Sequence, residues 1–440
     1  MAKITFMGAG STVFARNLLG DAMATPALKD SEIALYDIDK KRLEESATII
    51  NAINKGLGNH AKIYTYLGVE NRKDALRGAN FVINAIQVGL YDPCTITDFE
   101  IPNKYGLRQT IADTLGIGGI MRGLRTIPVL EGFARDMEEV CPDAWFLNYT
   151  NPMSILCGFM QRYTGVKTIG LCHSVQGCSY WLMKDLGLEA HLEGRKELIA
   201  GINHMGWLLD LKDKNGVDLY PQIRELAAAK NAAGKHNDMV RYEYIKHMGY
   251  YCTESSEHNA EYNPWFIKKN YPELIERFNI PLDEYPRRCI EQIAAWERDY
   301  SQLAANVEKA PHQRSEEYAS YIMESLTTGK PTKIGGNVIN NGLISNLPAE
   351  ACVEVPCMVD AYGVNPCHVG ALPVQLAAMN MTHVNVHLVT IEAAVTKKLD
   401  HVYQAAMLDP HTAAELSIDD IRNMVDDLID RHGDWLPKYV

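Results

Sequence analysis

The first half of the chain alternates short apolar runs with amphipathic stretches. Short apolar runs bounded by glycine or polar residues are typical of buried parallel strands. Five such runs lie at residues 3–7, 33–36, 81–86, 145–149 and 167–171. Between them, residues 40–55 place apolar side chains at helical spacing, which predicts an amphipathic helix. This rhythm predicts an α/β fold with a doubly wound, Rossmann-type parallel sheet, whose ligands bind beyond the carboxyl ends of the strands.

The pattern changes after about residue 195. Short apolar runs, which predict antiparallel or mixed strands, lie at residues 199–202, 207–211, 338–339 and 353–355. Two long helices are predicted at residues 287–307 and 417–431. Ser417 is expected to cap the second of these helices, and Gly433 to end it.

A length of 440 residues favours two domains over one core. We expect residues 1–195 to form the parallel-sheet domain and residues 196–440 a mixed α/β (α+β) domain. This layout resembles that of lactate and malate dehydrogenases. The active site is expected between the two domains.

Composition excludes some classes of partner. The 43 basic and 55 acidic residues give a net charge of −12, which argues against a nucleic-acid partner. No apolar run reaches the roughly 18 residues that a membrane span needs, so no membrane partner is expected. The chain enters a strand at once, without the pattern of a signal peptide. A cytoplasmic enzyme is therefore expected, and the ten cysteines should be reduced thiols, most of them small buried hydrophobes.

A glycine turn after the first strand predicts a nucleotide site. Gly8, Gly10 and Ser11 stand where the strand passes into a helix, so backbone amides can approach a pyrophosphate. Asp37 ends the second strand, where a carboxylate accepts from ribose hydroxyls and repels a 2′-phosphate, which favours NAD over NADP. Val13 replaces the usual third glycine. The alternative is a plain glycine turn with a helix-capping aspartate.

Two polar stretches are further candidates. Residues 113–122 combine an acid, three glycines and an arginine, which suits either a ligand-binding loop or a surface loop before a helix near Leu124. Asn148 and Asn151 follow an apolar strand, and their amides offer the donors and acceptors that sugar hydroxyls need. Asn151-Pro is also a common start of a turn.

Thiolate and imidazole groups suggest a metal site. Cys172 ends a strand, and His204 follows 32 residues later, so the two can share a metal only if their strand ends are adjacent. His204 is equally well explained as a core histidine. Residues 250–262 are dense in titratable groups, which suits general acid and base catalysis or a solvated helix start.

In this order the motifs resemble glycoside hydrolase family 4, the NAD- and metal-dependent glycosidases. The resemblance covers nearly the whole chain. Its motifs lie at residues 8–11, 113–116, 148–152, 172–177, 200–204, 253–258, 409–414 and 432–437. The Cys172-His-Ser-Val sequence resembles the α-galactosidase version within the family, and differs from that of the 6-phospho-glycosidases.

The resemblance implies an α-galactosidase that requires NAD and Mn²⁺ and acts on melibiose- or raffinose-type α-galactosides. It implies C3 oxidation, C2 deprotonation, elimination and addition of water, in place of the usual pair of carboxylates. It also implies a homodimer or homotetramer, with residues 1–195 binding NAD and the remainder carrying the catalytic, metal and oligomerisation functions.

Residue roles follow from the same resemblance. Cys172 and His204 would be the metal ligands, Tyr262 the base at C2, and His173 a proton donor. Asn151 would contact the substrate, and Asn148 and Arg288 are further candidates for that contact.

Several alternatives remain open. Within the family they are an α-galacturonidase, an α-glucosidase or a 6-phospho-α-glucosidase. Outside it they are a simple NAD-dependent 2-hydroxy-acid dehydrogenase, to whose site Cys172 would be foreign, and a non-catalytic NAD-binding regulator.

Overall fold

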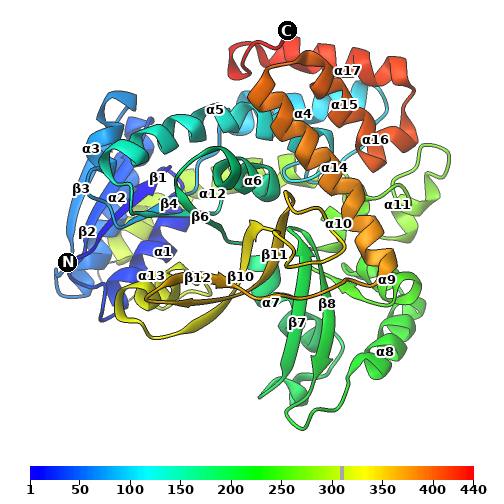
Figure 1. Ribbon diagram of the computed structural model, residues 1–440, viewed down its shortest axis with the longest axis horizontal. Helices are drawn as coiled ribbons and strands as arrows, with labels where there is room; N and C mark the ends of the chain where they lie inside the picture. The colour runs from blue at the N-terminus through cyan, green and yellow to red at the C-terminus, as the bar shows by residue number, and fades with distance from the viewer. Residues whose placement is uncertain (308–311) are drawn as a thin grey trace.

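One continuous sheet organises the molecule in the computed structural model, which describes residues 1–307 and 312–440 (Figure 1). Within these residues the sheet has 12 strands, in the order β3-β2-β1-β4-β5-β6-β10-β11-β7-β8-β9, with β12 paired to β11. The strands are β1 (Lys3–Met7), β2 (Glu32–Asp37), β3 (Lys62–Leu67), β4 (Phe81–Asn84), β5 (Trp145–Asn148), β6 (Lys167–Gly170), β7 (Lys196–Ile202), β8 (Met205–Lys212), β9 (Tyr251–Cys252), β10 (Thr332–Ile339), β11 (Cys352–Asp360) and β12 (Gly363–Pro366).

The first six strands confirm the predicted doubly wound sheet. All neighbours from β3 to β6 are parallel, in the order 3-2-1-4-5-6 of dinucleotide-binding folds. The five strands predicted for this half are present. The edge strand β3 was not predicted, because its side chains are largely exposed and lack the apolar pattern of a buried strand.

Helices cover both faces of the sheet (Figure 1). They are α1 (Thr12–Ala24), α2 (Lys40–Gly56), α3 (Arg72–Leu76), α4 (Ile96–Lys104), α5 (Gly116–Val140), α6 (Met153–Tyr163), α7 (His173–Asp185), α8 (Tyr220–Ala233), α9 (Met239–Met248), α10 (Ser256–Tyr262), α11 (Glu273–Arg277), α12 (Glu284–Val307), α13 (Ala319–Thr328), α14 (Val374–Thr396), α15 (Leu399–Leu408), α16 (Pro410–Glu415) and α17 (Ile418–His432). The predicted cap of α17 is confirmed, since the Ser417 side chain accepts a hydrogen bond from Asp420 N at 3.1 Å.

Helix α5 begins earlier than the sequence predicts. Its first turn starts at Gly116, whereas the sequence predicts a helix start near Leu124. Gly118 and Gly119 lie against the backbone of the preceding loop, and a Cβ on either would approach a carbonyl of Ala112 or Thr114 closer than 3.0 Å. The glycines therefore let a loop pack directly on a helix, a tertiary reason that outweighs their low helix propensity.

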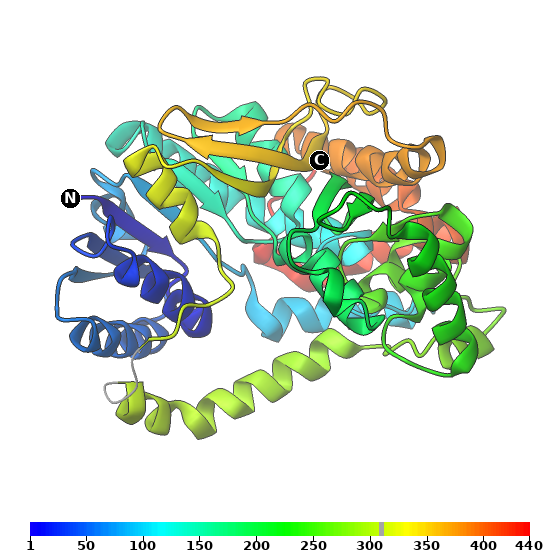
Figure 2. The ribbon, with the colours of Figure 1, turned by 90° about the horizontal axis from the view of Figure 1, so that it is seen from below.

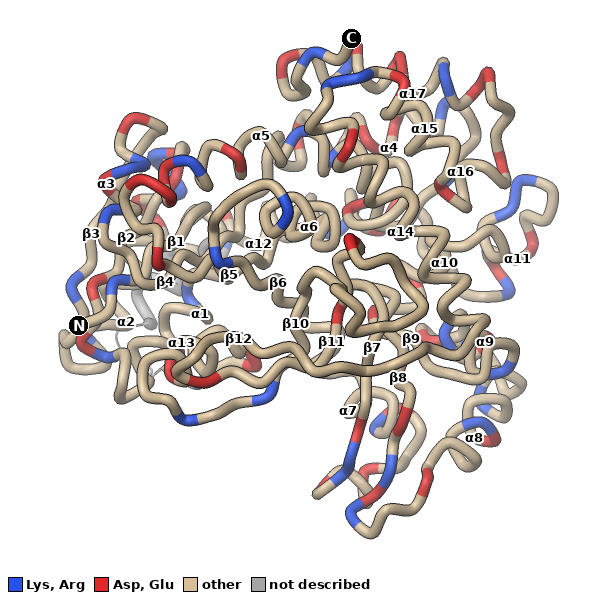
Figure 3. The backbone as a smooth tube through the Cα atoms, in the orientation of Figure 1, with Lys and Arg blue, Asp and Glu red and all other residues tan. Residues whose placement is uncertain are grey.

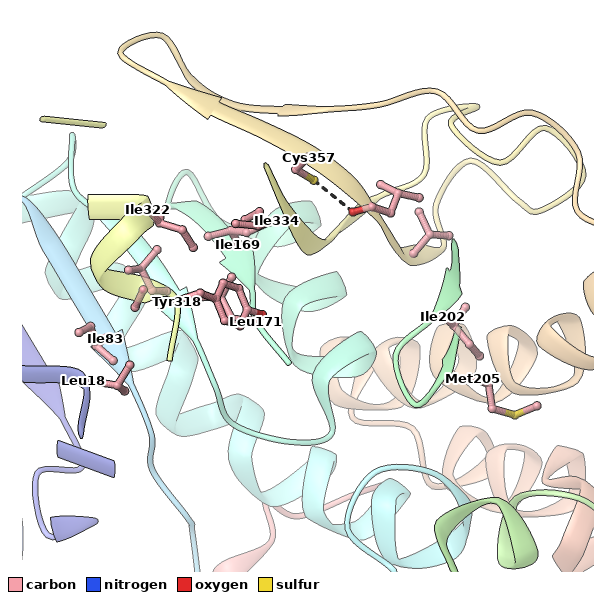
Figure 4. Packing of buried hydrophobic residues seen from close by; sticks show 14 of the residues in the cluster. Leu18, Ile83, Ile169, Leu171, Ile202, Met205, Tyr318, Ile322, Ile334 and Cys357 are labelled. Atoms are coloured by element: carbon pink, nitrogen blue, oxygen red, sulfur yellow. Dashed lines mark hydrogen bonds between the residues drawn. The ribbon is translucent and has the colours of Figure 1, made fainter. Parts of the chain in front are cut away.

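The antiparallel strands join the same sheet. Strands β10 and β11 lie between β6 and β7, through the pairs Asn337↔Gly170 and Glu354↔Gly201. The core is continuous across this junction, and Figure 4 shows Leu171, which follows β6, and Ile202, which ends β7, as parts of it. The domain boundary at residue 195 stays a prediction.

Helix α12 links the two halves of the chain. Seen from below, it runs along one side of the molecule toward α2 (Figure 2), and Trp296 Nε1 donates to Glu45 Oε2 at 2.8 Å. Acidic and basic residues are interspersed over the outer helices (Figure 3). Across residues 1–307 and 312–440, none of the helices combines the length and hydropathy needed to cross a bilayer.

Candidate active site

The glycine turn lies at the carboxyl end of β1, as the sequence predicts. Gly8 has φ +85°, and a Cβ there would lie 2.9 Å from Ala85 O. Gly10 N donates to Asp37 Oδ2 at 2.6 Å, so the aspartate at the end of β2 holds the turn. Ser11 is the N-cap of α1, and its side chain makes no capping hydrogen bond. Val13, in the first turn of α1, is 53% exposed, an apolar surface that a bound cofactor would cover.

The structure brings Cys172 and His204 together. Cys172 follows β6 and caps α7, and His204 lies in the two-residue turn between β7 and β8. Together with Glu254 they form a cluster whose ligand atoms lie within 4.8 Å of one another. His204 also belongs to a second set with Asp113 and His258, under the same distance limit. His204 is therefore shared by two overlapping groups of potential metal ligands.

Strained backbone marks this cluster. His204 has φ +65° and Glu254 φ +61°, and Ala112, next to Asp113, has φ +54°. Left-handed conformations are uncommon outside glycine and cost energy, so surrounding contacts must hold them. In these three loops the left-handed residues bring the side chains of His204, Glu254 and Asp113 close together.

The cluster is strongly acidic around one imidazole. Burial alone would lower the pKa of His204, but the carboxylate of Glu254 and the thiol group of Cys172 raise it to about 10. Burial opposes ionisation of Glu254, but the His258 and His204 rings and the Ser255 N–H lower its pKa to about 2. These anionic groups favour a cation beside His204.

The donors fit a divalent metal ion. Imidazole and carboxylate groups suit Mn²⁺ and similar ions, and the Cys172 thiolate adds a softer ligand. His204 Nε2 lies 3.3 Å from Glu254 Oε2. Its Nδ1 is occupied by the Tyr262 hydroxyl at 3.0 Å, which leaves Nε2 as the atom for a metal.

Tyr262 is buried, with its hydroxyl against His204. Burial, followed by the carboxylates of Asp113, Glu261 and Glu254, raises the pKa of Tyr262 well above 10. The Glu261 side chain is directed at the loop before Asp113, where it accepts hydrogen bonds from the backbone N–H groups of residues 110, 111 and 112. Glu261 thus holds the loop that carries Asp113.

His173 packs against helix α1, which begins at the glycine turn. Its Nε2 is 2.7 Å from Glu317 Oε2, and its ring packs edge-on against Phe14 at 5.7 Å between centroids. Burial lowers the pKa of His173, but Glu317 outweighs this effect and the net shift is upward. Tyr318, next to Glu317, donates to Cys172 O at 3.1 Å and connects this segment to the candidate ligand Cys172.

The two candidate asparagines differ in position. Asn151 Nδ2 lies 3.5 Å from Asp113 Oδ2, and its buried Oδ1 has no hydrogen-bond partner, so it can accept from a ligand. Asn148 is 1% exposed, and its amide is engaged by Asn84 and Thr150. The structure does not bring Asn148 into the cluster, and its contact with a sugar stays a prediction.

A cavity of about 440 Å³ is lined in part by residues 255–257, which directly follow the candidate ligand Glu254 in the chain. Arg288 lines it, paired with Glu257 at 2.5 Å and with Glu284 at 2.8 Å. Asn237 and Asn279 add amide groups, and the lining also includes Val240, Phe278, Ile280 and Pro281. A mixed lining of this kind suits the hydroxyls and apolar faces of a sugar.

Sequence reasoning did not single out Asp113, Glu254 or His258 as metal ligands, or Glu317 as the partner of His173. A usable signal was present, because Glu254 stands two residues after a strand and Asp113 opens the glycine-rich stretch. The acidic run at residues 250–262 is not a solvated helix start, since Ser256–Tyr262 is almost entirely buried.

Comparisons with known proteins identify relatives over the whole chain. Residues 3–188 match the family 4 glycosyl hydrolase model, and residues 199–412 match that of the family 4 glycosyl hydrolase C-terminal domain. An α-galactosidase of Bacillus subtilis (strain 168) is 59% identical over 439 residues, with 100% of both chains covered. An α-galactosidase of Rhizobium meliloti (strain 1021) is 34% identical, with 99% of this chain and 89% of the relative covered.

A solved structure shows the same fold. The 6-phospho-α-glucosidase from gut microorganisms, in complex with NAD and Mn²⁺, superposes with a TM-score of 0.81 over 100% of both chains, at 18% identity.

Proposed function

Since the chain belongs to family 4 of the glycosyl hydrolases, we propose that it is an NAD- and Mn²⁺-dependent α-galactosidase acting on melibiose- and raffinose-type sugars. The α-galactosidase of Bacillus subtilis, 59% identical, supports the sugar specificity. The observation that carries the chemistry is the convergence of Cys172, His204 and Glu254, with the Tyr262 hydroxyl 3.0 Å from His204.

The nucleotide would bind at the glycine turn. Gly8, Gly10 and Ser11 present backbone at the start of α1, and Asp37 lies at the end of β2 for the ribose hydroxyls. The metal would be held by Cys172 and His204, with Glu254 as a further ligand and Asp113 and His258 beside them. A related fold in complex with NAD and Mn²⁺ supports both cofactors.

Bound NAD⁺ would supply a reversible hydride acceptor for C3 of the galactose ring, and bound Mn²⁺ a Lewis acid beside the carbonyl formed there. Tyr262 would take the proton from C2. Burial holds the pKa of its phenol well above 10, so it can serve as a base only where positive charge near His204 lowers that pKa.

His173 would protonate the departing oxygen at C1, and would accept a proton from the water that later adds to C1. Its contact with Glu317 fixes the ring and favours the protonated form. Asn151 would accept a hydrogen bond from a sugar hydroxyl through its unpartnered Oδ1. No net oxidation results, so the nucleotide is reused.

The aglycone would extend into the cavity lined by Arg288. In this proposal the second sugar of melibiose or raffinose would contact the 255–257 segment, which lines the cavity and follows Glu254 in the chain. We also propose a homodimer or homotetramer in the cytoplasm. Ile290 and Ile293 of α12, 55% and 42% exposed, offer an apolar surface to a second copy.

A glycoside panel tests the proposal. Purified protein is assayed with p-nitrophenyl α-galactoside, α-glucoside, α-galacturonide and the 6-phosphorylated α-glucoside, with NAD⁺ and Mn²⁺ each omitted in turn. We expect turnover of the α-galactoside that needs both cofactors and leaves no net NADH. Preference for another glycoside would reassign the substrate. Stoichiometric NADH from a 2-hydroxy acid would identify a dehydrogenase, and NAD binding without turnover a regulator.

A further inference from the structure

A buried polar pair lies between the strands that carry the candidate metal ligands. Strands β6, β10, β11 and β7 are consecutive in the sheet, and one row across them reads Gly170, Asn337, Glu354 and Gly201. Cys172 comes two residues after the first member of this row, and His204 three residues after the last. The pair therefore lies below the two ligands and between their strands.

Hydrogen bonds connect this pair to both strand ends. Asn337 Nδ2 lies 2.9 Å from Glu354 Oε1 and 3.3 Å from Gly170 O. On the other side, Asn203 Nδ2 lies 3.4 Å from the same Glu354 oxygen. Asn203 directly precedes His204, so Glu354, together with Asn337, links the backbone before Cys172 with the turn that holds His204.

A glutamate at position 354 costs desolvation free energy, because its carboxyl group is buried in the sheet. It is 1% exposed, and the ion pairs of residues 1–307 and 312–440 include none that involves it. Its Oε2 has no hydrogen-bond partner, and burial raises its pKa to about 7. An apolar side chain in a sheet core would avoid these penalties. Stability alone gives no reason for a carboxyl group here, whereas holding two strand ends in register does.

We propose that Glu354 is a positioning residue that joins the ends of β6 and β7 and thereby sets the separation of the Cys172 and His204 ligand atoms. This inference rests on the metal site proposed above. Groups that orient metal ligands from behind commonly change metal affinity 10- to 100-fold when they are removed.

Mn²⁺ affinity of the full-length protein tests the inference, measured by electron paramagnetic resonance titration without substrate. We expect Glu354→Leu to raise the Kd for Mn²⁺ by 10-fold or more. Glu354→Gln should remain within about threefold of the unsubstituted protein, because the amide oxygen can still accept from Asn337 and Asn203. Val355→Ala, the next residue on the strand, is the matched control, since it opens the core without touching the bridge.

Three results would overturn the inference: unchanged Mn²⁺ affinity in E354L, equal losses in E354Q and E354L, or an equal loss in V355A. If E354L does not fold, the Mn²⁺ affinity of Glu354→Asp serves as the test. Its side chain is one methylene shorter and withdraws the carboxyl group from Asn337 and Asn203, so it should also weaken Mn²⁺ binding. Cys172→Ser separates the two proposals. Mn²⁺ binding that survives C172S would reject the metal site itself, whereas loss in C172S with full binding in E354L rejects only the role of Glu354.

Discussion

Cys172 differs from the other cysteines in its surroundings. In the part of the chain that the structure describes, it is the only cysteine that joins a group of potential metal ligands. Burial raises the pKa of thiols such as Cys157 and Cys178 to about 12, which keeps them protonated and inert. Residue type alone therefore does not identify the ligand, and the neighbouring imidazole and carboxylate do.

Cys172→Ser should abolish detectable Mn²⁺ binding and α-galactosidase turnover while leaving NAD affinity unchanged. A serine hydroxyl is a much weaker metal ligand than the sulfur of cysteine, so the site loses one of its ligands. Mn²⁺ and NAD titrations by calorimetry measure both parts. The control is Cys367→Ser, at a partly exposed cysteine outside the cluster. Full activity in C172S would contradict the assignment.

Tyr262→Phe should lower turnover by 10²-fold or more, the usual contribution of a positioned general base. Turnover is compared at saturating Mn²⁺, because the phenol also holds the His204 ring and its loss should weaken Mn²⁺ binding. The decisive measurement uses substrate deuterated at C2, whose label the unsubstituted enzyme should exchange with solvent and Y262F should keep. Tyr244→Phe is the control, since this buried tyrosine binds Asn259 O instead of His204. Exchange at the normal rate in Y262F would remove Tyr262 from the mechanism.

At the scale of elements, the start of α5 shapes the site. The helix carries glycine at positions 118 and 119, and the loop of residues 112–114, which includes Asp113, packs directly on these two glycines. Glu261 holds the same loop from the other side through three backbone N–H groups. The Asp113 carboxylate is thus placed by a helix and a buried side chain together.

Gly118→Ala should destabilise the protein by about 1–3 kcal/mol, the usual cost of overpacking, and weaken Mn²⁺ binding by displacing Asp113. The added methyl group would meet backbone of Ala112, which has little room to move. Gly132→Ala is matched to it, on the same helix. Its methyl group would meet only the flexible Arg72 side chain at 3.1 Å, so we expect no loss. Thermal unfolding and Mn²⁺ titration check both variants, and equal losses in the two would show that the contact of Gly118 with the loop is not responsible.

The sequence predicts most elements and only part of the site. Apolar runs identify five of the six parallel strands, and with them the position of Asp37 at a strand end, because burial on both faces gives a local signal; the exposed edge strand β3 lacks that signal. The start of α5 was misplaced, since its glycines serve a contact with a distant loop. Cys172 and His204 converge through the strand order β6-β10-β11-β7, and Glu254 joins them from the loop after β9, which pairs with β8; no local pattern contains this order. Metal ligands brought together by tertiary structure are therefore the hardest part to predict.

At the scale of the whole molecule, helix α14 joins the two halves of the chain. It packs against α5, α6 and α15 and against β7. Two histidines, His383 and His387, are buried in this junction, at 1% and 4% exposure. Burial lowers the pKa of His383 to about 4 and that of His387 to about 3, although Asp409 partly opposes the first shift.

These histidines predict acid sensitivity. In the unfolded chain an imidazole binds a proton near pH 6.5, whereas the folded protein keeps both rings neutral down to about pH 4 or 3. The unfolded state therefore binds more protons below pH 6.5, and stability is complete above that pH and falls as pH drops toward 3. Through His387 alone, the free energy of unfolding should fall by about 2 kcal/mol when the pH is lowered from 7 to 5.

His387→Gln should remove this pH-dependent loss of stability, because an amide does not bind a proton between pH 7 and pH 5. Urea unfolding at pH 7 and pH 5 measures the free energy of unfolding, and H387Q should lose about 2 kcal/mol less than the unsubstituted protein on acidification. His247→Gln serves as control, since that side chain is 61% exposed and its ring is solvated in both states. An identical acid response in all three proteins would mean that α14 does not hold His387 neutral. The fall in stability would then belong to other groups, and the junction between the two halves would not be the acid-sensitive part of the fold.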